Sequence, residues 1–317
     1  MQRKTKIITK YDFGHNIVCY DQYVISFGTS CSLNCEYCYL KYSKTPNIPV
    51  VYKIQHSQLE KELEELFSCD KKIFYFNAGE TTEPFLSEEH WENLCKTIQI
   101  ISNIAKKHNV KCFVELRTKT NNIIKFKTLP IQNENIKIVY SATLSPQEVI
   151  NNFEKNTASL KERLEALNYA AKLGFFISIN FEPIIFWPVL GIQKKKVLHS
   201  LHILINNYKQ IINQVVNIFE HQNFFMLNLS CLRLTKQQFK ILLDKKSKLC
   251  FFEMFLCEDG KFRYSRPIRI TIYNELINFV KSLCPGTENK IFLSFEFDYI
   301  WRVCGLKIFD NFSHLFF

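Results

Sequence analysis

The chain of 317 residues contains no uninterrupted apolar run of the roughly 18 residues that a membrane-spanning helix needs. Its basic amino terminus, residues 1–6, is not followed by a long apolar segment, so the sequence shows no secretory signal. It also has no internal repeat, low-complexity tract or linker rich in glycine and serine. Because 47% of the residues are hydrophobic, we expect a globular protein with a full core and no contact with a membrane.

Most of the twelve cysteines lack a repeating spacing, which argues against a disulfide scaffold. Thiols scattered in this way are typical of a reducing compartment, and we expect a cytoplasmic protein. The scattered cysteines are Cys19, Cys69, Cys95, Cys112, Cys231, Cys250, Cys257, Cys284 and Cys304.

Acidic residues are fewer than basic ones. The chain has 41 Lys and Arg against 30 Asp and Glu, which gives a formal net charge of +11 at pH 7. A basic balance is compatible with a nucleic-acid partner. The chain is also crowded with Lys, Asn, Ile and Phe, however, which biased codon usage would produce, so charge alone does not decide.

The other cysteines, Cys31, Cys35 and Cys38, follow one another at the spacing C-x3-C-x2-C. The β-branched and aromatic segment 23–27 predicts a buried strand, so these cysteines lie on a loop that leaves its carboxyl end. Three close thiolates suit three corners of a [4Fe–4S] cluster, which usually takes four thiolates, and leave one iron open. Three buried free thiols are one alternative. A zinc ion with a borrowed ligand such as His56 is another, although zinc usually takes four ligands and no second C-x2-C pair follows.

Strands and helices alternate along most of the chain. Expected strands cover 23–27, 72–77, 112–116, 136–142, 175–181 (closed by Pro183) and 224–229, and expected helices cover 57–67, 88–107, 160–173 and 193–219, the first three with N-caps at Ser57, Ser87 and Ser159. This alternation predicts parallel strands with helices outside. Six such units suit an α/β fold with an open, partial (β/α)6 TIM-like barrel, whose active loops sit at the carboxyl ends of the strands.

We expect this barrel, with an amino-terminal arm, to occupy residues 1–230 and an α+β extension that faces the substrate to occupy residues 231–317. The extension is expected to contain a helix over 236–244, a hairpin over 250–264, a helix over 267–282 and a strand over 291–295. The hairpin region mixes cations with aromatics, as binding of a single strand or a flipped base requires. An ordinary amphipathic hairpin with solvated charges is the alternative. The residues concerned are Lys261, Phe262, Arg263, Tyr264, Arg266 and Arg269.

Candidate ligand-binding side chains follow the later strands. After the second strand, Gly79 allows close backbone approach and the carboxylate of Glu80 can accept hydrogen bonds from a cation. An ordinary strand-to-helix turn with acidic residues near the helix dipole is the alternative. Lys119, Ser141 and Glu182 close the third, fourth and fifth strands, where each one alone is more often a solvated loop residue.

The cysteine spacing, with Tyr37 directly before the third cysteine, resembles the radical S-adenosylmethionine (SAM) superfamily. Several further segments resemble the spore photoproduct lyase family more closely and together span roughly residues 22–305. These segments are 31–40, 79–84, 116–119, 140–150, 157–166, 181–185 and 260–264.

The resemblance implies a [4Fe–4S] cluster on the three cysteines, with SAM on the open iron. It implies SAM contacts from Glu80, Lys119 and Ser141, a place for Gly79 beside the methionine ammonium, and adenosine or substrate contact from Glu182. It also implies that Tyr37 and Tyr39 relay a radical, because a phenoxyl radical is comparatively stable; their alternative role is an aromatic wall against adenine.

For the reaction, the resemblance implies that one electron, from a donor such as a flavodoxin or ferredoxin, cleaves SAM to methionine and a 5′-deoxyadenosyl radical. That radical then abstracts a hydrogen atom from a substrate, with the protein binding and orienting the reactants. Family members reverse a thymine-dimer lesion in DNA, so DNA is the expected substrate.

The sequence departs from the family at two positions. Ala78 replaces the first glycine of the family's GGE segment, and the loop 79–83 lacks the cysteine that donates a hydrogen atom in the lyases. Cys95, within a helix, and Cys112, at the start of a strand, are no obvious substitutes. Three hypotheses follow: a radical SAM enzyme acting on a DNA lesion, a radical SAM enzyme with another substrate, and a non-catalytic metal-bound nucleic-acid module.

Overall fold

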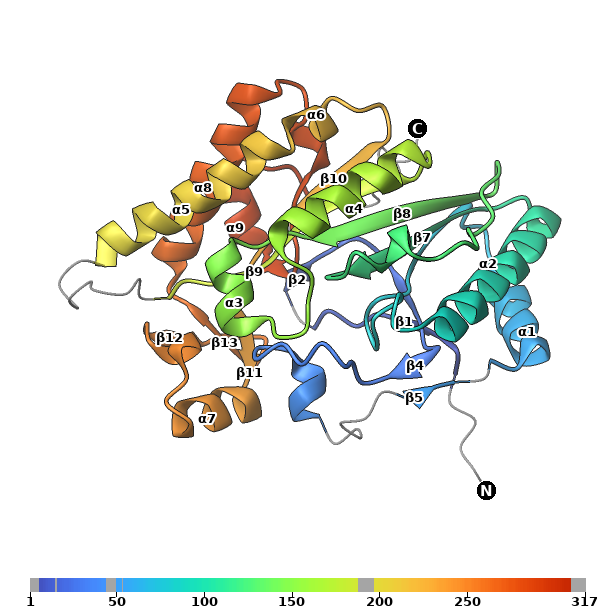
Figure 1. The fold of residues 1–317 in the computed structure, drawn as a ribbon, viewed down its shortest axis with the longest axis horizontal. Coiled ribbons are helices and arrows are strands. Elements are labelled where there is room, and N and C mark those ends of the chain that lie inside the picture. Colours follow the sequence, from blue (N-terminus) through green and yellow to red (C-terminus); the bar gives the residue numbers. More distant parts are fainter. Residues whose placement is uncertain (1–5, 15, 44–49, 53, 188–196, 309–317) are drawn as a thin grey trace.

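The computed structural model describes residues 6–14, 16–43, 50–52, 54–187 and 197–308 (Figure 1). Its centre is an eight-stranded sheet in the order β1-β3-β6-β7-β8-β9-β10-β14. β1 runs antiparallel to β3, and all the other neighbours in this sheet are parallel. The mostly parallel sheet expected from the alternation is therefore confirmed. The strands are β1 (Ile8–Lys10), β3 (Tyr23–Ile25), β6 (Ile73–Asn77), β7 (Lys111–Thr118), β8 (Ile136–Thr143), β9 (Phe176–Ile184), β10 (Phe224–Cys231) and β14 (Ile291–Leu293).

β9 is longer than expected, since the sequence suggested that Pro183 closes this strand. The structure instead continues β9 to Ile184. The register between β10 and β9 shifts between Leu229 and Cys231, beside this proline. Proline lacks an N–H group, and such an irregularity is where a strand tolerates it.

Helices cover the outside of the sheet, with α2 and α1 at one end and α4, α5 and α8 along the upper face in Figure 1. Ser87 and Ser159 cap their helices as expected, but the Ser57 cap is wrong, because this helix begins at His56 after Gln55. Of the helix expected over 193–219, residues 193–196 lie outside the described residues. The remainder forms α5 and α6, which are interrupted at Val215. The helices are α1 (His56–Phe67), α2 (Glu88–His108), α3 (Gln147–Phe153), α4 (Leu160–Lys172), α5 (Val197–Gln214), α6 (Val216–Phe219), α7 (Lys236–Asp244), α8 (Arg266–Leu283) and α9 (Asp298–Val303).

The sheet is strongly curved. Tyr75 on β6 stacks on Phe225 of β10 with ring centroids 5.9 Å apart, although three strands separate β6 from β10 in the sheet. Phe113 on β7 packs on the same phenylalanine at 5.5 Å. These buried rings fill part of the concave side and contribute to one continuous core.

The carboxyl-terminal region is joined to the rest by β14, which extends the central sheet next to β10, and by α8, which packs on α5. The expected hairpin is confirmed as β12 (Met254–Leu256) and β13 (Lys261–Tyr264), with Gly260 at a left-handed φ of 73° in the turn. β11 (Arg233–Thr235) completes a small antiparallel sheet in the order β11-β13-β12. Among the described helices, none has the length and apolar character that a membrane crossing demands.

Candidate functional site

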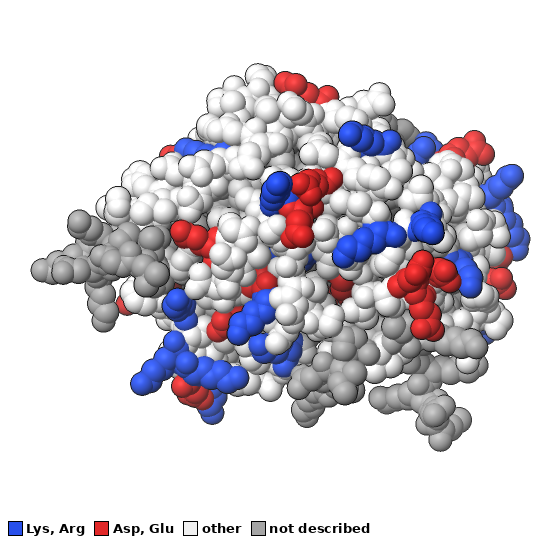
Figure 2. Space-filling view, viewed as in Figure 1, with Lys and Arg blue, Asp and Glu red and all other residues white. Residues whose placement is uncertain are grey.

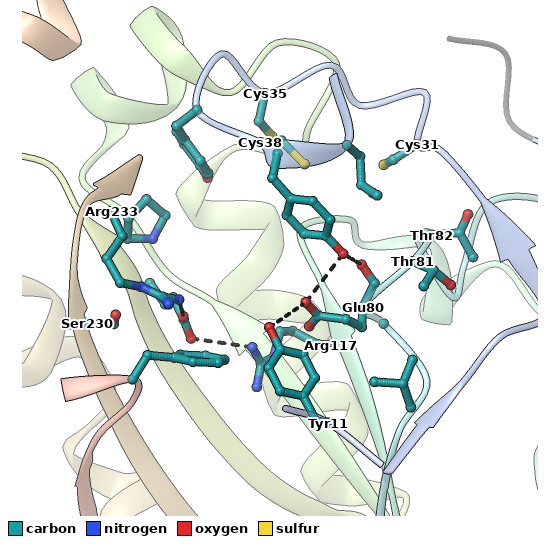
Figure 3. A pocket seen from close by; sticks show the side chains of 18 of the residues that line it. Tyr11, Cys31, Cys35, Cys38, Glu80, Thr81, Thr82, Arg117, Ser230 and Arg233 are labelled. Carbon is teal, nitrogen blue, oxygen red and sulfur yellow. Dashed lines mark hydrogen bonds and ion pairs between the residues drawn. The ribbon is translucent and has the colours of Figure 1, made fainter. Parts of the chain in front are cut away.

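The carboxyl ends of the central strands open into a cavity of about 560 Å³. Apart from Ser141, every site residue expected from the sequence lines it, although these residues are spread from position 31 to position 182. They are Cys31, Cys35, Cys38, Tyr37, Tyr39, Gly79, Glu80, Lys119 and Glu182. Figure 3 shows the cysteines above Glu80, with Tyr11 below it and Arg233 on the opposite side from Cys31. The fold thus gathers side chains from distant loops into one site.

Contacts from two later parts of the chain hold the cysteine loop. The Glu36 N–H donates to the Phe153 carbonyl at 2.8 Å. Gln238, on α7, donates to the Tyr37 carbonyl at 3.1 Å, and the Ser247 hydroxyl donates to the Glu36 carboxylate at 2.6 Å. The loop is therefore fixed both by the end of α3 and by the region around α7.

The three thiols lie in a largely buried environment that contains both Lys119 and carboxylates. Burial raises the pKa of Cys31 to about 12 and also raises the pKa of Cys35 and Cys38. The charge of Lys119 acts in the opposite direction on all three thiols. Burial of this kind favours the neutral thiol, so a bound cationic group would be needed to hold three thiolates here.

The donor set fits an iron–sulfur cluster better than a single ion. A zinc ion needs ligands that converge at about 2.0–2.3 Å, and within the described ranges no three His, Cys, Asp or Glu side chains are grouped in that way. His56 begins α1 and lines neither this cavity nor a second one of about 690 Å³ on the other side of the loop. All three cysteines line both cavities. Three thiols with no fourth ligand grouped beside them in the described part of the chain suit a [4Fe–4S] cluster with one open iron.

Gly79 and Glu80 follow β6 and meet the end of β7. A Cβ atom at position 79 would lie 2.5 Å from the carbonyl oxygen of Arg117, so only glycine fits there. The Glu80 carboxylate accepts a hydrogen bond from the Tyr11 hydroxyl at 3.3 Å (Figure 3) and another from the Asn77 amide at 3.4 Å. Burial raises the pKa of Glu80, although the charge of Arg117 opposes this.

Glu182 is shared between two guanidinium groups. Arg117 Nη1 lies 3.3 Å and Arg233 Nη2 lies 3.1 Å from the two Glu182 carboxylate oxygens. Arg117 also pairs with the buried Glu115 at 3.1 Å. This chain of charges spans the cavity between β7, β9 and β11.

Ser141 lies beneath the cavity. Its hydroxyl donates to Glu115 at 2.6 Å and accepts from the Asn180 amide at 2.6 Å, and Asn180 in turn accepts from Asn228 at 2.6 Å. These buried side chains form a hydrogen-bonded row across neighbouring strands. Ser141 therefore supports the Glu115–Arg117 pair, and its hydroxyl does not reach the cavity.

The two tyrosines of the cysteine loop have different surroundings. The Tyr37 hydroxyl donates to Glu154, a buried carboxylate that pairs with Arg163 at 2.6 Å. The Tyr39 hydroxyl donates to the Glu80 carbonyl at 2.9 Å, and 43% of Tyr39 is exposed. Tyr39 is thus hydrogen-bonded to the loop after β6, and Tyr37 to the buried ion pair.

Sequence reasoning missed several side chains of this site. Tyr11, Ser230 and Arg233 line the cavity, but they lie in an arm and at a strand junction without a recognisable motif. Glu83 is buried and accepts from Thr118, and burial raises the pKa of Glu83. Arg163 lies in the family-like block 157–166, which was the available signal for a buried ion pair.

A three-cysteine loop beside a parallel sheet is typical of radical SAM enzymes. The family model of spore photoproduct lyase matches residues 10–248, which is most of the chain. The chain therefore belongs to the spore photoproduct lyase family, whose members are radical SAM lyases.

Solved structures of spore photoproduct lyase have the same fold. One, complexed with dinucleoside spore photoproduct, is 18% identical, with a TM-score of 0.64 over 86% of this chain and 75% of that chain. A mutant with bound AdoMet and dinucleoside spore photoproduct is also 18% identical, with a TM-score of 0.65 over 87% and 76% of the two chains. No curated protein sequence matches the chain at a significant level.

The structure does not bring Cys95 or Cys112 to the cavity. Cys95 is buried in α2 and Cys112 at the start of β7. Cys231 ends β10 at the cavity wall, but its thiol lies against Tyr273 of α8. The expectation that neither Cys95 nor Cys112 substitutes for the missing thiol of the loop 79–83 is therefore confirmed.

Proposed function

We propose that this protein uses a [4Fe–4S] cluster on Cys31, Cys35 and Cys38 to cleave SAM, and acts on a thymine-dimer lesion of DNA. One observation supports this proposal most strongly. The cysteine loop lines the same cavity as Gly79, Glu80 and Lys119. When bound, the cluster would supply the electron that breaks the sulfonium C–S bond of SAM and gives a 5′-deoxyadenosyl radical.

The protein's own residues would orient SAM through complementary charges. Glu80 is an acceptor for the methionine ammonium, held in place by Tyr11 and Asn77. Lys119, which lies near all three thiols, is the cation for the carboxylate. In this proposal Ser141 acts through Glu115 and does not contact SAM, and Glu182 positions Arg117 and Arg233 on the adenosine or substrate side.

Tyr37 and Tyr39 are the proposed radical relay. Tyr39 is the better placed of the two for contact with the reacting groups, because it opens into the cavity beside Glu80. The Lys119 ammonium lies over the Tyr37 ring, 5.8 Å from its centre, which is a cation–π contact. The alternative role of both rings is an apolar wall for adenine.

We also propose that the curved sheet is a partial (β/α)6 barrel formed by β3, β6, β7, β8, β9 and β10. The contact of Tyr75 with Phe225 across the concave side supports this arrangement. Residues 231–317 would then be the substrate-facing extension, since Arg233, Gln238 and Lys261 line the cavity. A flavodoxin or ferredoxin is the proposed electron donor, and the cytoplasm the proposed location.

DNA as the substrate is supported by surface charge beside the cavity. Figure 2 shows Lys and Arg side chains gathered at the lower left, over α7. Lys236 and Lys240 on α7, and Lys245 and Lys246 just after it, are all exposed. Because α7 also carries Gln238 at the cavity wall, a DNA strand bound along these lysines would lead into the cavity.

A second candidate is a radical SAM enzyme with a different substrate. The loop from Gly79 to Glu83 contains no thiol, and a carboxylate such as that of Glu80 or Glu83 cannot replace an S–H group as hydrogen-atom donor. Formation of 5′-deoxyadenosine without turnover of the spore photoproduct would favour this candidate. Repair of the lesion by cluster-loaded protein with SAM and reductant would favour the first one. Zinc-loaded protein that binds DNA and never cleaves SAM would contradict both.

A further inference from the structure

The wall of the cavity opposite Cys31 carries cations from the small sheet. Arg233 on β11 and Lys261 on β13 both line the cavity, and these strands are antiparallel neighbours in which Thr235 pairs with Lys261. Figure 3 shows Arg233 and Ser230 together on this side. Ser230 thus comes from the end of β10, Arg233 from β11 and Lys261 from β13.

Two of these polar groups have no side-chain partner among the described residues. Ser230 is only 1% exposed and lines the cavity, and within the described ranges its hydroxyl has no side-chain hydrogen bond. The ammonium of Lys261 likewise makes no hydrogen bond or ion pair with any described residue. Lys261 is half-buried and both residues line the cavity, so the ammonium and the hydroxyl are donors available to a group bound there.

Among the described residues, the Lys261 ammonium has no carboxylate paired with it, whereas the guanidinium groups of Arg233 and Arg117 each have at least one. Glu182 is the only carboxylate paired with Arg233 among the described residues, and Arg117 shares it. Asp259, the acid nearest to Lys261 in sequence, pairs with Arg263 at 2.6 Å. Burial and the charge of Arg233 lower the pKa of Lys261 to about 8. An anion bound beside Lys261 would favour the charged form of its amine.

We propose that Ser230, Arg233 and Lys261 form an anion subsite that binds a backbone phosphate of a nucleic-acid substrate. The assignment of the anion to nucleic acid rests on the proposed function. A phosphodiester offers acceptor oxygens to a guanidinium, an ammonium and a hydroxyl at once, which is the donor set present here. The subsite would place a backbone phosphate across the cavity from the cysteines. The adjoining base would then lie between the phosphate and the cysteines.

The test compares two probes on the intact, cluster-loaded protein with SAM. The first probe is a tetrathymidylate, and the second is the same oligomer with uncharged methylphosphonate linkages. We expect the anionic oligomer to bind about tenfold more tightly at low salt, because the subsite recognises charge. Lys261→Gln and Ser230→Ala should remove most of this preference, whereas Lys261→Arg should retain it. Lys96→Gln, which removes an exposed lysine of α2, is the matched control and should leave the preference unchanged.

Several results would overturn the subsite. Equal affinity for the two oligomers, or no binding of either, would do so. An equal loss of preference in Lys96→Gln would show a general charge effect. A higher KM for SAM in Lys261→Gln, measured as 5′-deoxyadenosine formed without oligomer, would assign the anion to the SAM carboxylate. Absence of 5′-deoxyadenosine in the unmodified protein is a different failure, because it contradicts the proposed function itself.

Discussion

Gly79 and Arg117 approach each other so closely that a Cβ atom on residue 79 would overlap the Arg117 backbone. Such an atom would lie 2.5 Å from the carbonyl oxygen and 3.0 Å from the nitrogen of Arg117. The contact brings the ends of β6 and β7 together and sets Glu80 beside the Arg117 guanidinium. A packing requirement, in addition to any ligand, therefore explains the glycine at this position.

Gly79→Ala should move the loop that carries Glu80. Because the clash is with backbone atoms, the strands must separate, and we expect a loss of about 1–3 kcal/mol in the free energy of unfolding. The KM for SAM should rise as well. Denaturant unfolding and a 5′-deoxyadenosine assay check the two effects. Gly305→Ala is a useful comparison, because a Cβ there meets no atom within 4 Å although φ is 66°. An unfolding free energy for Gly79→Ala equal to that of the unmodified protein would refute the steric account.

The buried pair of Glu154 and Arg163 should be needed for stability. Arg163→Met leaves the Glu154 carboxylate buried without its cation, and breaking such a pair usually costs about 3–5 kcal/mol. A double variant with Glu154→Gln should be less destabilised than Arg163→Met alone. Denaturant unfolding of the three proteins measures this difference. Additive losses in the double variant would contradict coupling between the two residues.

The same pair predicts a pH dependence of stability. Burial opposes ionisation of Glu154, but Arg163 and Lys119 outweigh it, so the pKa of Glu154 lies below its usual value. Its stabilising contribution is present above the unfolded pKa and is lost as pH falls through the lower, folded pKa. Glu154→Gln should therefore flatten the acid limb of an unfolding curve measured between pH 6 and pH 3. An unchanged acid limb would exclude Glu154 as its source.

As the pH is lowered, SAM affinity should begin to fall at a higher pH than it would if Glu80 had the pKa of an ordinary glutamate. Burial raises the pKa of Glu80, and the protonated acid cannot serve as an anionic acceptor for the SAM ammonium. Titration of SAM binding from pH 8 to pH 5 should show the loss, and Glu80→Gln should bind weakly at every pH. A pH-independent affinity in the unmodified protein would remove Glu80 from this role.

Substitutions of Tyr37 and Tyr39 should differ in their effect on stability. Tyr39→Phe removes a hydroxyl at the cavity, and we expect a loss of substrate turnover with little effect on unfolding. Tyr37→Phe removes the partner of a buried carboxylate, so about 1–3 kcal/mol of stability should be lost in addition. Turnover assays and denaturant unfolding on both variants provide the check. Equal stability losses would show that their surroundings do not differ in the way described.

The sequence was sufficient for those features that depend on local pattern. Apolar runs between turns predicted the strands of the parallel sheet, and C-x3-C-x2-C spacing predicted the cysteine loop. Since carboxyl ends of parallel strands share one edge, Glu80, Lys119 and Glu182 could be expected to meet.

Features that depend on long-range packing were not predictable. Tyr11 reaches Glu80 across 69 positions of the chain, and no local pattern marks that contact. Ser141 was expected at the end of its strand, but β8 continues to Thr143, and the Ser141 hydroxyl is bonded to Glu115 and Asn180 inside the sheet. The Ser57 cap failed because a serine near the start of a helical pattern does not determine which residue begins the helix.

The most direct test of the central claim is 5′-deoxyadenosine formation from SAM by anaerobically prepared protein with measured iron and sulfide. We predict about four irons and four sulfides per chain, reductant-dependent 5′-deoxyadenosine, and loss of both in Cys31→Ala, Cys35→Ala and Cys38→Ala. Cys69→Ala, at an exposed cysteine away from the cavity, should retain both. Unmodified protein that carries no cluster, or alanine variants that still cleave SAM, would contradict the account.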